Sequence, residues 1–232
     1  SLNKFVKVPV DYFDKESQWS AFAELVRRPA AAYLEYSDSA IASIHSFSSG
    51  NPFFAKWICR SLYSEMILKR DSHVTEFEVA RSVNQTLSEM GTHSVQYFWQ
   101  DGIIDPAPRA EEIAVRRAKV LLSLTECIRR GEVPTASAIA SRAKQFELDD
   151  HVVEHDLRSF ERRKVLESKS GVYGCKVKLF QDWLVSQGYY QILTTFVDSE
   201  ALSQAVKHEE SLRIKDDEIL ALVEKWDLFL GR

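Results

Sequence analysis

Two histidines and one glutamate in the sequence have the spacing of a metal site. His151, Glu154 and His155 form the pattern H-x-x-E-H, in which the histidines of inverted zinc peptidases bind the metal and the glutamate activates a water molecule. Histidines four residues apart also occur by chance on polar helix faces, and the spacing singles out no third ligand. We therefore interpret these residues as an exposed helix face, expect no metal site, and keep a metallopeptidase only as the least favoured function.

No other catalytic motif is complete in the sequence. The P-loop pattern G-x-x-x-x-G-K-[ST] is absent, as is a strand followed by paired acidic residues that could hold magnesium. No serine or cysteine has the local context of a known nucleophile. We expect the chain alone to catalyse no reaction and to carry no cofactor of its own.

The composition is that of a globular protein. The 232 residues suffice for one large domain or two small ones, and 45% of them are hydrophobic. Cys59, Cys127 and Cys175 are odd in number and far apart, which argues against a disulfide framework and favours buried thiols in a reducing cytosol. No apolar run approaches the roughly 20 residues that span a membrane, and no leader is apparent, so we expect a cytoplasmic protein without membrane attachment.

The first hundred residues, 1–100, are predicted to form a bundle of short helices. Apolar residues recur with helical spacing over residues 15–28 and stop at Pro29. Residues with good capping chemistry precede three further apolar stripes, and for one of them the capping box is complete. These capping residues are Ser37, Asn51 and Thr75.

The turn between the second and third predicted helices is Gly50-Asn51-Pro52. Gly50 suits the left-handed position after a helix, Asn51 is a good N-cap, and Pro52 suits the first helical turn because its missing N–H would be unpaired there. These preferences explain the turn without any ligand.

Residues 101–108 contain Gly102, Pro106 and Pro108 and break the helical period, so we predict a linker there. Residues 109–185 are expected to hold a long helix over 109–130 and two short helices, followed by a hairpin in which alternation runs from Tyr173 to Leu179. Three helices followed by a two-stranded hairpin is the order of a winged helix-turn-helix. The short helices are capped by Thr135 and by Asp149 or Asp150.

The C-terminal part, residues 186–232, is predicted to be a helical tail. One helix is expected to begin near Trp183 and to run to about Leu193. A charged helix over residues 209–230 has an apolar side that must pack against another element. The predicted fold is therefore mainly α, with a helical bundle, a winged helix and a helical tail.

Basic residues near the predicted wing could contact DNA or a protein partner. Residues 109–185 carry 15 basic and 12 acidic groups, a net charge of +3, which is sparse for a dedicated DNA-binding module. The expected recognition helix begins with acidic residues that repel phosphate, and we place Asp156 among its exposed acids. A protein contact is therefore favoured over DNA. The candidate contacts are Arg158, Arg162, Arg163, Lys164, Lys176 and Lys178.

Three stretches of the sequence carry a resemblance to one known family. They are residues 25–59, with an Arg-Pro helix end and Gly-Asn-Pro before an aromatic-rich helix, residues 155–167, and residues 173–184. The pattern resembles the C-terminal part of STAND-type ATPases, the signal-transducing branch of the AAA+ P-loop proteins. It covers roughly residues 17–190 as an order of elements more than as invariant residues.

The resemblance implies that residues 1–100 are an ATPase lid. The lid would cover ATP or ADP, bound with Mg mainly by an ATPase core that precedes Ser1, and Pro52 would pack near the adenine. Gly50 and Asn51 would shape the turn, and the helix N-terminus would offer N–H donors to the nucleotide. Lys56, and one turn later Arg60, are candidate phosphate contacts.

Related regulatory ATPases place a His-Asp pair just after the wing hairpin to contact the ADP phosphate. The equivalent position here is Gln181-Asp182, while His155-Asp156 lies before the hairpin. This departure argues against phosphate sensing by the winged helix.

The sequence thus favours a regulatory fragment of a STAND-like or AAA+-like ATPase. We expect the lid to move with ATP or ADP and the winged helix to transmit that movement, with the ATPase core and a protein effector as partners. The alternative is a winged-helix DNA-binding module similar to that of replication-initiator ATPases.

Overall fold

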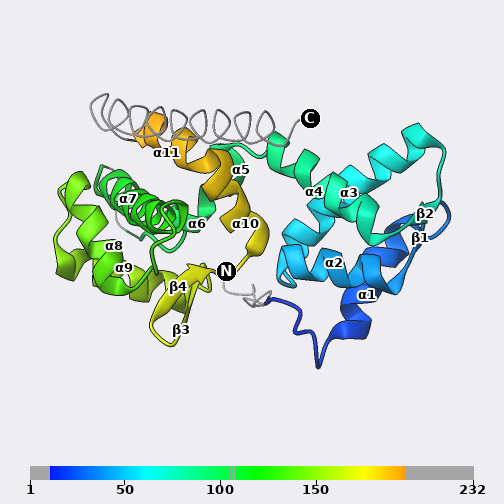
Figure 1. Cartoon of the computed structure of the whole chain (residues 1–232), viewed down its shortest axis with the longest axis horizontal. Coiled ribbons are helices and arrows are strands. Elements are labelled where there is room, and N and C mark those ends of the chain that lie inside the picture. The colour runs from blue at the N-terminus through cyan, green and yellow to red at the C-terminus, as the bar shows by residue number, and fades with distance from the viewer. Residues whose placement is uncertain (1–10, 105, 107, 197–232) are drawn as a thin grey trace, which may run out of the picture.

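The computed structural model describes residues 11–104, 106 and 108–196, and this part of the chain is mainly helical, as predicted. Figure 1 shows two groups of elements side by side, α1–α4 in one and α7–α9 with the hairpin β3–β4 in the other. Helix α10 lies between the two groups. The predicted helix 209–230 falls outside the described residues.

The first group contains α1 (Trp19–Arg27), α2 (Asp38–Ser48), α3 (Pro52–Lys69) and α4 (Glu76–Glu89), with a 3-10 turn, η1, over Arg28–Ala30. Local capping chemistry starts three of these helices as predicted. The Ser37 hydroxyl accepts a hydrogen bond from the Ala40 N–H at 3.1 Å, and Thr75 forms the complete capping box with Glu78. Helix α1 begins four residues later than predicted, because Asp14 and Ser17 form a turn in front of it.

Short elements between α1 and the predicted linker have no counterpart in the sequence prediction. Strands β1 (Glu35–Tyr36) and β2 (His73–Val74) pair in parallel. Helices α5 (Thr92–Val95) and α6 (Tyr97–Gln100) are each one turn long. Elements of two to four residues are too short for a period to be recognised.

The second group contains α7 (Arg109–Arg129), α8 (Ala136–Ala143), a 3-10 turn η2 (Lys144–Phe146) and α9 (Asp150–Arg162). The antiparallel hairpin of β3 (Leu166–Lys169) and β4 (Val172–Cys175) follows. An additional bridge joins Thr135, just before α8, to Val172 at the start of β4. The order of three helices and a hairpin is as predicted.

The hairpin is shorter than the predicted alternation. Strand β4 ends at Cys175, and Lys178 begins α10 (Lys178–Trp183). A π-helical segment, η3 (Leu184–Gly188), leads into α11 (Tyr189–Phe196). The helix expected to begin near Trp183 therefore begins five residues earlier.

Helix α10 joins the two groups through buried contacts. The Trp183 indole N–H donates to the Met90 carbonyl at 3.0 Å, and the rings of Phe180 and Phe98 stack with centroids 4.1 Å apart. One hydrophobic core therefore runs through both groups, across the predicted linker at residues 101–108. Within the part of the chain that the structure describes, no helix has the length and apolar character to cross a membrane.

Candidate functional site

The turn between α2 and α3 has an unusual backbone. Ser49 and Gly50 both lie in the left-handed region, with φ of 51° and 72°, where only Gly50 was expected to do so. Asn51 then caps α3 as predicted, since its side-chain oxygen accepts from the N–H groups of Phe53 at 2.9 Å and Phe54 at 3.4 Å. Pro52 is the first residue of α3.

This capping corrects one expectation for nucleotide binding. The resemblance implied that the start of α3 offers N–H donors to a nucleotide. Pro52 has no N–H, and Asn51 already accepts from Phe53 and Phe54. The next donor, the N–H of Ala55, bonds the Asn51 carbonyl at 3.0 Å. The first turn of α3 therefore has no unused donor for a phosphate.

Gly50 is buried beneath the segment that precedes α1. The Phe13 N–H donates to the Gly50 carbonyl at 2.8 Å, and His45 Nε2 lies 2.9 Å from the Phe13 carbonyl oxygen. A Cβ atom at Gly50 would lie 2.1 Å from that same oxygen. Both the positive φ and the close approach therefore require glycine here.

The outer face of α3 carries an aromatic residue and two cations in one stripe. We define the α3 face as Phe53, Lys56 and Arg60, which follow one another at helical spacing. Phe53 is 48% exposed, and its ring lies 5.6 Å from that of Trp57 and 5.9 Å from that of Tyr97. Lys56 and Arg60 are exposed, and neither pairs with another described residue. Chemically, the α3 face can stack a planar ring and attract an anion.

Most of the candidate DNA contacts are already paired with carboxylates. Arg158 bonds Glu154 at 2.9 Å, and Lys164 pairs with Asp11. The remaining two pairs join lysines after the hairpin or in α10 to neighbouring acids, while Arg162 is exposed. These two pairs are Lys176 with Glu167 at 2.9 Å and Lys178 with Asp182 at 2.8 Å.

Arg163 is turned inward, unlike the other candidate contacts. Its guanidinium lies 5.1 Å from the centre of the Phe160 ring, and its Nε and Nη2 atoms are buried without a hydrogen-bond partner. Burial, together with repulsion from Arg117, lowers the pKa of Arg163 to about 10. Arg163 is therefore poorly placed to contact a phosphate backbone.

Asp156 was expected on an exposed face, and that expectation is wrong. Its side chain is fully buried and accepts hydrogen bonds from Arg116 Nε at 2.7 Å and Nη2 at 2.9 Å. Arg117, which follows Arg116 on α7, donates to the Asp101 carbonyl at 3.0 Å and to the Ser159 hydroxyl at 3.3 Å. The position of Arg117 within the apolar stripe of α7 was the available signal that a charge is buried here.

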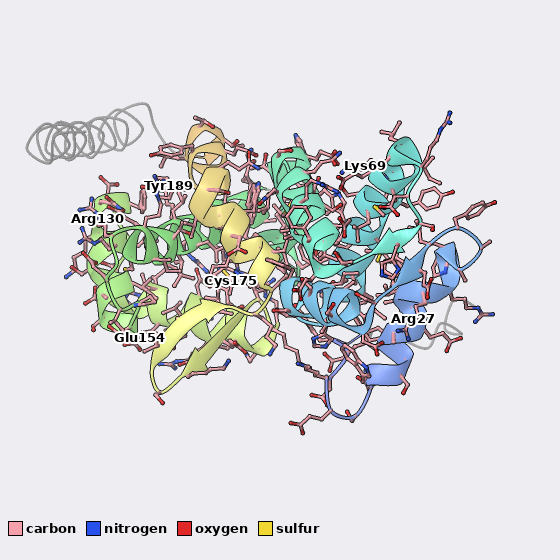
Figure 2. All side chains as sticks on the ribbon, turned by 45° about the vertical axis from the view of Figure 1, so that its right-hand side comes forward. Arg27, Lys69, Arg130, Glu154, Cys175 and Tyr189 are labelled. Atoms are coloured by element: carbon pink, nitrogen blue, oxygen red, sulfur yellow. The ribbon has the colours of Figure 1, made fainter. Side chains whose placement is uncertain are left out.

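The H-x-x-E-H residues lie at the start of α9. His151 is exposed, Glu154 is engaged by Arg158, and the imidazole of His155 lies 3.2 Å from Asp156. Figure 2 places Glu154 at the outer edge of the molecule. Among the residues that the structure describes, no group of three or more potential metal ligands comes together.

The three cysteines are free thiols. Burial raises the pKa of Cys127 to about 11 and that of Cys59 to about 12. Cys175 is buried at the centre of the molecule, where the hairpin leads into α10 (Figure 2). Thiols that stay protonated at neutral pH are poor nucleophiles, so packing explains these cysteines.

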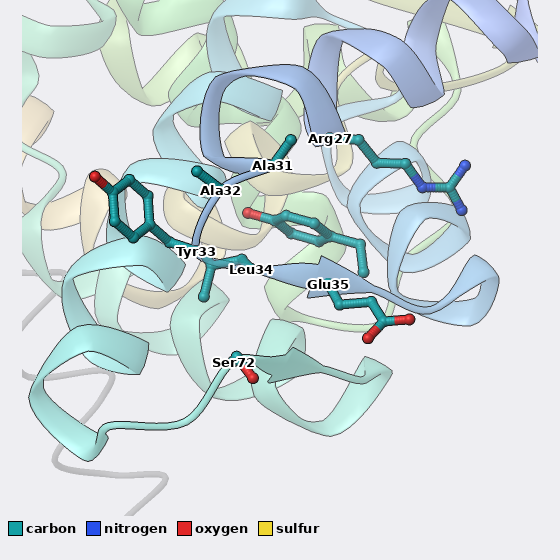
Figure 3. A pocket seen from close by; sticks show the side chains of 8 residues that line it. Arg27, Ala31, Ala32, Tyr33, Leu34, Glu35 and Ser72 are labelled. Atoms are coloured by element: carbon teal, nitrogen blue, oxygen red, sulfur yellow. The ribbon is translucent and has the colours of Figure 1, made fainter.

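A shallow hollow of about 570 Å³ lies beside β1, away from the Gly50 turn. Figure 3 shows the Tyr33 ring on one side of it and the side chains of Arg27 and Glu35 on the other. Arg27 is already paired with Asp38 at 2.6 Å. Because its polar groups do not converge, the hollow lacks the features of a specific ligand site.

Comparisons of the chain with protein-family models, with curated proteins and with solved structures found no match. Function therefore has to be inferred from the residues and their geometry. Three features carry such an inference: the α3 face, the Gly50 turn, and the buried contacts of α10 with both groups.

Proposed function

We propose that the chain is the regulatory C-terminal part of a STAND-like or AAA+-like ATPase, and that it couples nucleotide state to conformation. One observation carries the proposal: α10, which directly follows the hairpin, packs on the turn between α2 and α3. The backbone N–H of Lys178 donates to the Ser49 hydroxyl at 3.2 Å. The turn between α2 and α3, which we propose lies near the nucleotide, is therefore in contact with α10, which we propose transmits the movement of the lid.

The second group of elements supports a winged helix-turn-helix. Helices α7, α8 and α9 precede the β3–β4 hairpin, and the bridge between Thr135 and Val172 adds the short third strand contact of such domains. The first group supports a lid, with a helix that begins at Asn51-Pro52 after a buried glycine. We assign residues 1–100 to the lid and residues 109–185 to the winged helix.

The nucleotide would meet the lid along the α3 face. Phe53 offers an exposed ring beside Pro52 on which a base can stack, and Lys56 and Arg60 supply positive charge one and two turns further on. Because the first N–H donors of α3 are capped, Lys56 and Arg60 replace the backbone N–H groups as the proposed phosphate contacts. An upstream core would supply the main ATP, ADP and Mg contacts.

Movement of the lid would reach the winged helix through α10. The Gly50 turn contacts α10 at Ser49 and Lys178, and the far end of α10 is fixed to the lid by the Trp183 bond to Met90. Close-packed interfaces have discrete arrangements and transmit strain. A shift of the turn would therefore displace or strain α10 along its whole length.

DNA binding is the weaker candidate. Phosphate contacts would have to replace the carboxylate partners of Arg158, Lys164, Lys176 and Lys178. Arg163 is additionally buried against Phe160. Few of the candidate basic side chains are therefore unpaired and able to neutralise a phosphate. Phosphate neutralisation releases counterions from DNA, and this release supplies most of the affinity of such modules.

The proposal predicts a P-loop upstream of Ser1 in the natural protein. The reading frame should encode G-x-x-x-x-G-K-[ST] between a strand and a helix, within one domain length, roughly 100 to 250 residues, before Ser1. Sequencing the transcript and the purified natural protein checks this. A natural chain that begins near Ser1, or one with an upstream domain that lacks a P-loop, would contradict the proposed function.

A further inference from the structure

The segment in front of α1 runs between the two groups of elements. In Figure 1 it leaves the start of α1 and passes toward the space between α2 and the hairpin. We define the strap as Asp11, Tyr12 and Phe13. Asp14 ends it, because the Asp14 side chain accepts from the N–H and hydroxyl of Ser17 and so forms the turn that leads into α1.

One end of the strap is fixed to the lid. The Phe13 N–H bonds the Gly50 carbonyl, and the Phe13 carbonyl lies 2.9 Å from His45 Nε2. The Phe13 ring meets that of Phe22 on α1 edge-on, with centroids 5.8 Å apart. Phe13 thus contacts α1, α2 and the Gly50 turn together.

The other end is fixed to the winged-helix group. The Tyr12 hydroxyl donates to the Lys164 carbonyl at 3.0 Å, and Asp11 pairs with the Lys164 ammonium group. Lys164 follows α9 in the left-handed region, with φ of 56°. These two contacts join residues 152 and 153 positions apart in the chain.

We propose that the strap is a latch that holds the lid and the winged-helix group together and docks as one unit. Its three residues are divided between the groups, with Phe13 on the lid and both Tyr12 and Asp11 on Lys164. Three consecutive residues cannot leave one anchor without straining the other.

The latch is built to open more easily than the core around α10. Asp11 is exposed, and Tyr12 and Phe13 are only partly buried, whereas Phe180 and Trp183 of α10 are fully buried. Segments with few buried apolar contacts open at lower free energy than the global fold. The strap can therefore release while both groups stay folded.

Because the latch contacts both groups, an upstream element that binds or moves it would act on both groups at once. A pull on the strap would act on the Gly50 turn and on the α9 end together. This use of the latch by an ATPase core rests on the proposed function. The docking of the strap as a unit does not, because its contacts lie within this chain.

Hydrogen exchange of the Phe13 amide, which bonds Gly50, tests the latch in the full chain without nucleotide. The double variant Tyr12→Phe, Lys164→Met removes the side-chain hydrogen bond and the ion pair at Lys164 and leaves every lid contact of Phe13. We expect the Phe13 amide to exchange on the order of tenfold faster. The control, Tyr33→Phe, Lys169→Met, makes the same chemical changes at exposed residues away from the strap.

A second pair of variants acts from the lid side. Gly50→Ala should displace Phe13. The control is Gly131→Ala, because Gly131 has a similar positive φ, 69° against 72° at Gly50, but an added Cβ there meets nothing within 4 Å. Only Gly50→Ala should alter the amide signals of Lys164 and Val165. Equal Phe13 exchange in the double variant and its control would overturn the latch, even where Gly50→Ala fails to fold.

Discussion

Replacing Trp183 with alanine is expected to lower the free energy of unfolding by about 3–5 kcal/mol, the range for truncating a large buried aromatic residue. Trp183 is fully buried at the joint between the two groups. Its indole N–H donates to the Met90 carbonyl just after α4, and its ring stacks on Phe180 with centroids 5.9 Å apart. Truncation removes this packing and leaves the Met90 carbonyl without its donor.

The loss should also change the cooperativity of unfolding. Because α10 carries the shared core, we expect the single transition of the parent chain to broaden or split into two in Trp183→Ala. Urea denaturation followed by circular dichroism measures both effects. Trp57→Ala, at a half-buried tryptophan on α3, is the control. A Trp183→Ala variant no less stable than Trp57→Ala would contradict the role of α10 as the joint.

Replacing Arg116 with methionine is expected to cost about 3–5 kcal/mol, because it leaves the buried carboxylate of Asp156 without its bidentate partner. The measurement is chemical denaturation at neutral pH. Arg158→Met, which breaks the exposed pair with Glu154, is the control and should cost at most about 0.5 kcal/mol.

A double variant separates the cost of the stranded charge from the worth of the pair. Arg116→Met, Asp156→Leu removes both charges, so we expect it to recover most of the stability lost in Arg116→Met. If the double variant is as unstable as Arg116→Met, the loss of stability comes from losing the Arg116–Asp156 ion pair and not from leaving the Asp156 charge buried. That result would also contradict our description of Asp156 as a carboxylate that needs Arg116.

The sequence predicted the elements whose signals are local. Ser37, Asn51 and Thr75 each satisfy backbone donors within three residues of themselves, so their chemistry is legible without knowledge of the fold. The hairpin was extended too far because Val177 and Leu179 continue the alternation of β4. Buried Phe180 and Trp183 instead give α10 a helical stripe that starts at Leu179.

The parts of the site that depend on distant residues were missed. The conformation of Gly50 was predicted from its type, but not the strap above it, because the strap reaches Lys164 across 153 positions. Asp156 was placed on an exposed face because its partner Arg116 lies 40 positions away. No local pattern reports such pairings, although Arg117 within an apolar stripe hints at one.

The most direct test of the central claim is amide hydrogen exchange of the natural full-length protein with ATP and with ADP. Two segments are compared, the turn and start of α3 at residues 48–54 and α10. We predict that exchange in both segments differs between the two nucleotides by roughly 5- to 150-fold, the usual range of allosteric coupling. Exchange that is the same with either nucleotide bound, or the absence of nucleotide binding, would contradict the claim that this chain couples nucleotide state to conformation.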